Sequence, residues 1–103
     1  MRDRVDAVFQ ALADSNRRFV LETLADRGSA TATELAAELP VTRQAVAKHL
    51  GALRSAELVE ATRAGREVRY HLTPEPLTDA LTWMEQVGAH WDERLEALRR
   101  HLL

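Results

Sequence analysis

The segment that follows Thr42 is predicted to be a helix with one polar face. At 100° per residue, Val46, Leu50 and Leu53 fall on a single stripe and form the inner side. The opposite face is polar and basic, with small residues at its centre. The residues of this face and its shoulders are Arg43, Gln44, Ala47, Lys48, His49, Gly51, Arg54 and Ser55.

The side chains of this face have the chemistry that is needed to read double-stranded DNA. The major groove is about 12 Å wide and admits one helix, and small side chains let the helix approach the base edges. Gln44 can form two hydrogen bonds with adenine, and Arg43 can do so with guanine. Lys48 and the Thr42 hydroxyl are suited to phosphates, while His49 either binds a phosphate or packs at the helix edge. The alternative is an ordinary solvated helix surface.

A second basic group follows this helix. Residues 58–63 and 67–72 flank a short turn, and apolar positions alternate with polar ones in the second segment, which predicts a β-hairpin. Arg63 and Arg66 lie at the predicted tip, and Arg69 lies on the outward face of the returning strand. Three such arginines would place positive charge along a DNA backbone. The alternative is that they are edge-strand charges that deter aggregation.

Local signals place both groups on a chain of helices with one hairpin. Asp14, Thr31 and Thr42 are predicted N-caps, Thr31 and Glu34 form a capping box, and Gly28 ends a helix. The predicted helices cover residues 3–13, 14–28, 31–39, 42–55 and 77–102, and the predicted hairpin turns at Ala64-Gly65. The turn of about three residues before Thr42 gives a helix-turn-helix arrangement. We therefore expect a mainly α fold with a small β-hairpin, a winged helix-turn-helix, in one domain over residues 1–103.

The first and last predicted helices carry more apolar surface than one small chain covers. Positions 77, 81, 84, 88, 91, 95, 98 and 102 alternate in spacing between four and three, and all are Leu, Met or Trp except Gly88. A homodimer would bury this seam across a two-fold axis. The predicted dimer interface, in helices 3–13 and 77–102, consists of Val5, Phe9, Leu12, Trp83, Met84, Val87, Trp91, Leu95 and Leu98. The alternatives are an intramolecular contact of the two tryptophans and a small apolar effector pocket.

Three stretches of the sequence together form a family pattern. They are Ala11-Leu12-Ala13-Asp14 with Asn16-Arg17-Arg18, TATELAAELPVTRQAVAKHLGALRSAELV, and ATRAGREVRYHL. Over nearly the whole chain they resemble the ArsR-type winged helix-turn-helix repressors. The resemblance implies a homodimer, joined by its first and last helices, that binds inverted-repeat operator DNA and represses transcription. The recognition-helix residues that it implies are Thr42, Arg43, Gln44, Ala47, Lys48 and His49, with a wing from Arg63 to Arg69.

The sequence indicates neither a metal site nor a catalytic site. It contains no cysteine, so the thiolate sites of the family's arsenic and cadmium sensors cannot form. Counted from the wing strand, the ligand positions of the family's zinc site fall on Pro74, Pro76, Val87 and His90, three of which cannot bind metal. The residue types of a hydrolase triad occur without a Gly-x-Ser-x-Gly nucleophile context. We therefore expect no metal, no cofactor and no enzymatic activity, and a small-molecule effector is not indicated.

Length and charge define the class of protein. A chain of 103 residues gives one domain, and it holds no run of about 18 apolar residues and no secretory leader, so we expect a cytoplasmic protein. The net charge of −2 alone would argue against nucleic acid. However, residues 1–40, 41–73 and 74–103 carry −2, +3 and −3, so the basic excess lies in the predicted recognition helix and hairpin. The competing hypothesis is a dimeric protein-interaction module without specific DNA binding.

Overall fold

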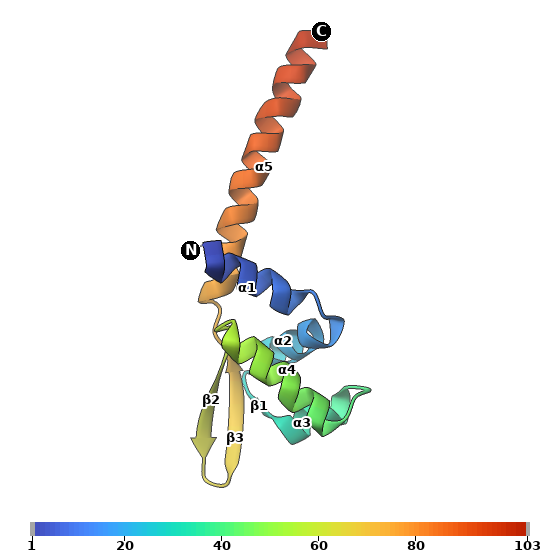
Figure 1. The fold of residues 1–103 in the computed structure, drawn as a ribbon, viewed down its shortest axis with the longest axis vertical. Coiled ribbons are helices and arrows are strands. Elements are labelled where there is room, and N and C mark those ends of the chain that lie inside the picture. The colour runs from blue at the N-terminus through green and yellow to red at the C-terminus, as the bar shows by residue number, and fades with distance from the viewer. Residues whose placement is uncertain (1, 103) are drawn as a thin grey trace.

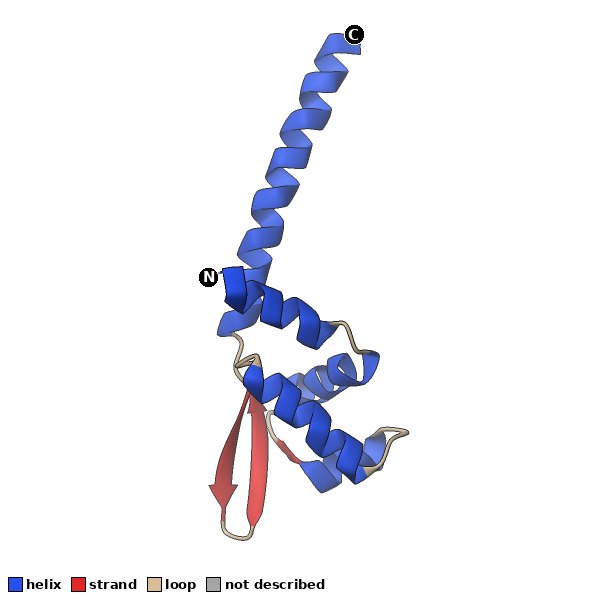
Figure 2. Ribbon diagram, viewed as in Figure 1, coloured by secondary structure: helices blue, strands red, loops and turns tan. Residues whose placement is uncertain are grey.

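The computed structural model describes residues 2–102, which form a small domain with one long helix projecting from it (Figure 1). The described residues form five helices and three strands (Figure 2). In chain order these are α1 (Arg2–Leu12), α2 (Ser15–Arg27), β1 (Ala30–Thr31), α3 (Ala32–Glu38), α4 (Arg43–Ser55), β2 (Val59–Ala64), β3 (Glu67–Leu72) and α5 (Glu75–Leu102). The expected fold class, mainly α with a small hairpin in a winged helix-turn-helix, is confirmed.

Helices α3 and α4 form the helix-turn-helix, and their N-terminal caps are those that the sequence predicts. The Thr31 hydroxyl accepts a hydrogen bond from the Glu34 amide at 3.1 Å, and the Glu34 carboxylate accepts one from the Thr31 amide at 2.8 Å. This reciprocal pair satisfies two amides that the first turn of α3 leaves without helical partners. Thr42 Oγ1 accepts a hydrogen bond from the Ala45 amide at 3.1 Å and begins α4.

Helices α1 and α2 are joined by bonds that satisfy the ends of both. The Asp14 carboxylate accepts hydrogen bonds from two amides of the first turn of α2, at 2.8 and 3.3 Å. In return, the Arg17 guanidinium donates to the Gln10 and Ala11 carbonyls at the end of α1, at 3.0 and 2.7 Å. Gly28 follows α2 with a φ of 85°, a conformation that glycine adopts without steric cost.

The hairpin is formed by β2 and β3, and its turn lies one residue later than predicted. Ala64 pairs with Glu67, so the turn residues are Gly65 and Arg66 rather than Ala64-Gly65. Gly65 has a φ of 64°, which suits the first position of a two-residue hairpin turn. Arg66 is therefore at the tip of the wing.

A third strand, β1, extends the hairpin into a sheet with the order β1-β3-β2. This two-residue strand pairs antiparallel with β3, with Ala30 opposite Tyr70 and Thr31 opposite Arg69. The sequence did not predict it, because two residues are too few to show an alternating pattern. Since Thr31 also caps α3, the wing is joined directly to the start of the helix-turn-helix.

One apolar core holds these elements together. The inner stripe predicted for α4 is confirmed, since Val46, Leu50 and Leu53 are buried. They pack in one cluster with side chains from α1, α2, α3 and the strand β2. Other fully buried residues are Val8, Val20, Leu24, Leu35, Leu58 and Val59. This core fixes the orientation of α4 and leaves its polar face outside.

Helix α5 begins at Glu75, two residues before the predicted start. Pro76 lies in its first turn, where the missing amide costs no helical hydrogen bond. Pro76 and Ala80 are buried, and this first part of α5 packs on α1. Its C-terminal part projects away from the domain (Figure 1), which gives the described chain extents of 66 × 27 × 22 Å.

Candidate nucleic-acid interface

The polar face of α4 is open to solvent. Thr42, Arg43, Gln44, Ala47 and Lys48 are all exposed. Thr42 uses its side-chain oxygen as the cap of α4, which leaves the hydroxyl proton free to donate. These five predicted DNA-contacting residues therefore form one continuous, accessible surface on the first two turns of the helix.

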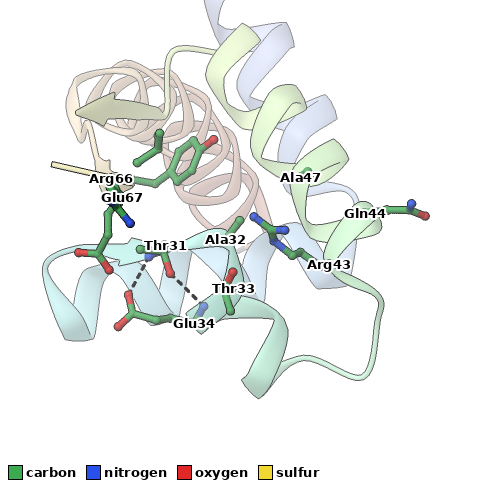
Figure 3. A pocket seen from close by; sticks show the side chains of 11 residues that line it. Thr31, Ala32, Thr33, Glu34, Arg43, Gln44, Ala47, Arg66 and Glu67 are labelled. Atoms are coloured by element: carbon green, nitrogen blue, oxygen red, sulfur yellow. Dashed lines mark hydrogen bonds between the residues drawn. The ribbon is translucent and has the colours of Figure 1, made fainter. Parts of the chain in front are cut away.

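A groove of about 740 Å³ lies between this face, helix α3 and the wing. In Figure 3 the Arg43 side chain extends from α4 toward the other residues of the groove, whereas the Gln44 side chain, which also lines the groove, extends outward from α4 at its rim. The residues that line the groove are Thr31, Ala32, Thr33, Glu34, Arg43, Gln44, Ala47, Arg66, Glu67, Val68 and Tyr70. The structure thus brings predicted residues from α4 and from the wing to two sides of one concave surface.

The three wing arginines have different environments. Arg63 at the end of β2 and Arg66 in the turn are exposed, as predicted. Arg69 is only 29% exposed in its side chain, and its guanidinium is used within the chain. Its Nε donates to Ser29 Oγ at 3.0 Å, and its Nη2 lies 3.2 Å from a Glu34 carboxylate oxygen. The prediction that Arg69 faces outward toward DNA is therefore wrong, because β1 and α3 cover that side of β3.

Glu34 and Glu67 are acidic residues in a groove that Arg43 and Arg66 also line. The Thr31 amide, which donates to its carboxylate, holds the pKa of Glu34 below its usual value; partial burial opposes this, and the charges of Arg69 and Arg27 add to it. Arg27 Nη2 lies 3.1 Å from Glu34. The sequence indicates Glu34 only as part of a capping box, since its partner Arg69 is 35 residues away along the chain.

His49 lies on the shoulder of α4 and is half-buried. Its charge is one of the causes that lower the pKa of Asp14, the N-cap of α2. Partial burial raises the pKa of Asp14, but the Arg17 and Asn16 amides that donate to its carboxylate, with the charges of His49 and Arg17, lower it overall. A phosphate contact by His49 remains a prediction.

A second surface, formed by apolar side chains of α5, is exposed along the projecting part of the helix. The residues that are at least about half exposed are Leu81, Trp83, Met84, Trp91, Leu95, Leu98 and Leu102, and Val87 is half-buried beside them. Trp83 packs edge-to-face on Phe9 of α1, with ring centroids 5.5 Å apart and an interplanar angle of 70°. Phe9 and Leu12 are half-buried, so α1 contributes to the base of this surface.

Val5 does not belong to this exposed surface. Its side chain is only 5% exposed within a single chain. The prediction that Val5 lies in a dimer interface is therefore wrong for this structure, because packing within the chain already covers it. The apolar pattern of α1 marks a buried stripe without separating the part that faces the chain's own core.

No metal-binding cluster is found among the described residues. Over residues 4–102, whose side chains the structure describes, no group of three or more histidine and acidic side chains is arranged to hold an ion. In the same part of the chain, no helix combines the length and apolar character that crossing a membrane would require.

Comparisons with known proteins place the chain among transcriptional regulators. A family model described as a helix-turn-helix domain matches residues 12–62. The transcriptional repressor SdpR of Bacillus subtilis is 32% identical over 77 residues, which cover 75% of this chain and 84% of SdpR. The solved structure of an ArsR-like transcriptional regulator from Rhodococcus sp. RHA1 has a TM-score of 0.84 and 40% identity, and the match covers 96% of this chain and 92% of that one.

A further solved structure is a homodimeric winged helix-turn-helix DNA-binding domain of an ArsR-family candidate regulator, Mb0332 from Mycobacterium bovis. It is 31% identical, with a TM-score of 0.66, and the match covers 88% of this chain and 81% of that one. The structural matches extend well beyond the helix-turn-helix.

Proposed function

Since the chain belongs to the ArsR-type family of winged helix-turn-helix transcriptional regulators, we propose that it binds a specific operator as a homodimer and represses transcription. The operator would be an inverted repeat, because a two-fold dimer presents two identical reading helices to successive major grooves about 34 Å apart. As a regulator that acts on DNA, it would work in the cytoplasm without catalysing a reaction. The domain would span residues 1–103.

The observation that carries this proposal is the open polar face of α4 beside the wing. Gln44, which points away from the protein, would pair with adenine, and Arg43 would pair with guanine. Each such pair is worth about 1–3 kcal/mol of discrimination between bases. Lys48 and Thr42 would hold phosphates beside them, and the small side chain of Ala47 would allow close approach.

The wing would contribute contacts to the DNA backbone. Arg63 and Arg66 are exposed at its end, and Arg66 lines the groove beside Glu67. Their contacts would fix the register of the protein without reading sequence. His49 would add a further phosphate contact at the side of α4.

The exposed apolar surface of α5 supports the homodimer. A side chain such as Trp91, which is 60% exposed on a single chain, gains stability when a partner covers it. The homodimeric relative has the same fold over most of this chain. The proposed interface comprises the sequence-predicted residues without Val5, which are Phe9, Leu12, Trp83, Met84, Val87, Trp91, Leu95 and Leu98.

Selection of bound DNA from a random pool tests this function. The expected result is enrichment of an inverted repeat whose half-sites lie about one helical turn apart. A protein that enriches no sequence, yet forms dimers, would contradict the proposal and support the protein-interaction module.

The double variant Gln44→Ala/Lys48→Ala tests the assigned face. It should lose binding to the selected DNA while remaining dimeric. Gln86→Ala, which changes an exposed glutamine on the polar side of α5, is the matched control and should bind as the wild type does. Unchanged binding by the double variant would refute the assignment of α4 as the reading helix.

A further inference from the structure

The wing is anchored to the helix-turn-helix by side chains as well as by its strands. Thr31, the N-cap of α3, lies opposite Arg69 in the β1–β3 pair. The Arg69 side chain reaches across to the segment before α3, where its Nε donates to Ser29 Oγ at 3.0 Å and its Nη2 to the Ser29 carbonyl at 3.4 Å. Arg69 therefore ties β3 to the chain segment that leads into α3.

Glu34 is the residue on which these ties converge. One carboxylate oxygen, Oε1, accepts the Thr31 amide at 2.8 Å and lies 3.2 Å from Arg69 Nη2. The other, Oε2, lies 3.1 Å from Arg27 Nη2 at the end of α2. Figure 3 shows the Glu34 carboxylate beside Thr31 at the wall of the groove, with Glu67 of the wing above it. A single carboxylate thus connects α2, α3 and the wing.

These contacts matter for the direction of the wing because only its base packs on the core, through Val59, Tyr70 and Leu72, whereas residues 62–68 are exposed. Strand β1 offers only two residues for pairing with β3. A two-stranded ribbon alone is marginally stable and twists readily. The Glu34–Arg69 ion pair, with its atoms 3.2 Å apart and both side chains only about one third exposed, adds a further contact to this short ladder.

We propose that Glu34 is a positioning residue for DNA binding, which holds the wing through Arg69 at the angle where Arg63 and Arg66 reach the DNA backbone. The inference rests on the proposed function, since it concerns how the same surface engages DNA. It assigns to Glu34 no contact with DNA. It also gives a reason for a carboxylate in a groove that faces phosphates.

Simple electrostatics predicts the opposite effect when Glu34 is neutralised. A carboxylate in a DNA-binding groove repels phosphates, so its removal alone should strengthen binding. If Glu34 positions the wing, its removal should weaken binding instead. Whether the affinity for DNA rises or falls on neutralising Glu34 therefore separates a merely repulsive carboxylate from a positioning residue.

The test is the affinity of Glu34→Gln for the selected operator, measured by fluorescence anisotropy at 0.1 M salt. Gln keeps an oxygen that can accept the Thr31 amide, so α3 retains its cap. The association constant varies as the salt concentration to the power of about −0.9 for each phosphate contacted. At 0.1 M salt, the loss of one wing contact should therefore lower the association constant about eightfold. The matched control is Glu38→Gln on the same helix. Glu38 pairs with Arg27 and lies outside the groove lining, so its affinity should remain that of the wild type.

A second variant shows whether Glu34 acts through Arg69. In an Arg69→Met background the wing has already lost its anchor, so adding Glu34→Gln should no longer weaken binding. In Glu34→Gln, hydrogen exchange should become faster in β3 while the amides of α4 keep their protection. A urea titration on each variant confirms that the affinities refer to folded protein.

Three results would overturn the proposal. The first is tighter or unchanged operator binding by Glu34→Gln. The second is an equal loss of affinity in Glu38→Gln. The third is that Glu34→Gln lowers affinity as much in the Arg69→Met background as in the wild type. Absence of operator binding by the wild-type protein would instead contradict the proposed function, so the two failures are distinguishable.

Discussion

Substitution of Leu95 by alanine should dissociate the proposed homodimer. Leu95 lies on the apolar seam of α5 and is 57% exposed on a single chain. Full burial of a leucine stabilises a protein by about 1.5–3 kcal/mol, so covering the exposed fraction is worth about 0.9–1.7 kcal/mol. Two-fold symmetry doubles the effect to about 2–3 kcal/mol, which corresponds to a rise of about 30- to 150-fold in the dimer dissociation constant.

Sedimentation equilibrium over a concentration series measures this constant directly. Alanine has the highest helix propensity, so Leu95→Ala should keep the helix and alter only the apolar contact. Glu93→Ala is the matched control, because position 93 is exposed on the opposite side of the same turn and should leave the constant unchanged. Circular dichroism verifies that both variants remain helical.

The consequence for DNA binding follows from the two-fold symmetry. Leu95→Ala should weaken binding to a complete inverted repeat much more than binding to a single half-site, since only the former needs two linked protomers. The reasoning is refuted if Leu95→Ala and Glu93→Ala give the same dissociation constant, or if the wild-type protein remains a monomer at tens of micromolar.

Three further predictions concern the reading face, salt and acid. Gln44→Ala should mainly reduce discrimination between the operator and altered sequences, whereas Lys48→Ala should weaken binding to all sequences. Lys48→Ala should also lower by about one the slope of log affinity against log salt concentration, as anisotropy titrations would detect. Identical affinity profiles of the two variants would contradict the assigned roles. If the dimer contacts about 6–10 phosphates, affinity should fall by about 10³ to 10⁵ between 50 and 200 mM salt, and binding that does not respond to salt would argue against the interface. The folded-state pKa of Asp14 lies below its usual value of 3.8, because donation from the Arg17 and Asn16 amides outweighs partial burial. The contribution of Asp14 to the free energy of unfolding is therefore complete above the unfolded-state pKa and is lost as pH falls through the folded-state pKa. Urea titrations should show that the free energy of unfolding of Asp14→Asn falls less steeply with acid than that of the wild type. Parallel curves of the two proteins would refute this.

Local sequence signals predicted the helices well because the physics that fixes helix ends is local. The Thr31–Glu34 capping box and the Thr42 cap involve bonds over three residues, so spacing alone reveals them. The buried stripe of α4 likewise follows from helical periodicity. The hairpin turn was misplaced by one residue, since only the pairing of Ala64 with Glu67 fixes its register.

Tertiary contacts account for what the sequence did not reveal. Strand β1 exists because β3 pairs with it from 38 to 40 residues away along the chain, and Arg69 is turned inward by partners at positions 29 and 34. Val5 shows the same limit in α1, where periodicity predicts an apolar face without showing what covers it. For the candidate site, sequence could predict which residues form the reading face but not the charge network that supports it.

That network also explains how an acidic chain presents a basic surface. The excess of +3 in residues 41–73 counts Arg69 and Glu67, which lie 3.5 Å apart and largely cancel each other. Among residues 4–102, whose side chains the structure describes, no carboxylate lies within ion-pair distance of Arg43, Lys48, Arg63 or Arg66, so these cations can pair with phosphates. Net charge therefore says little about such a protein. What decides its affinity for DNA is which arginines are already paired when the DNA arrives.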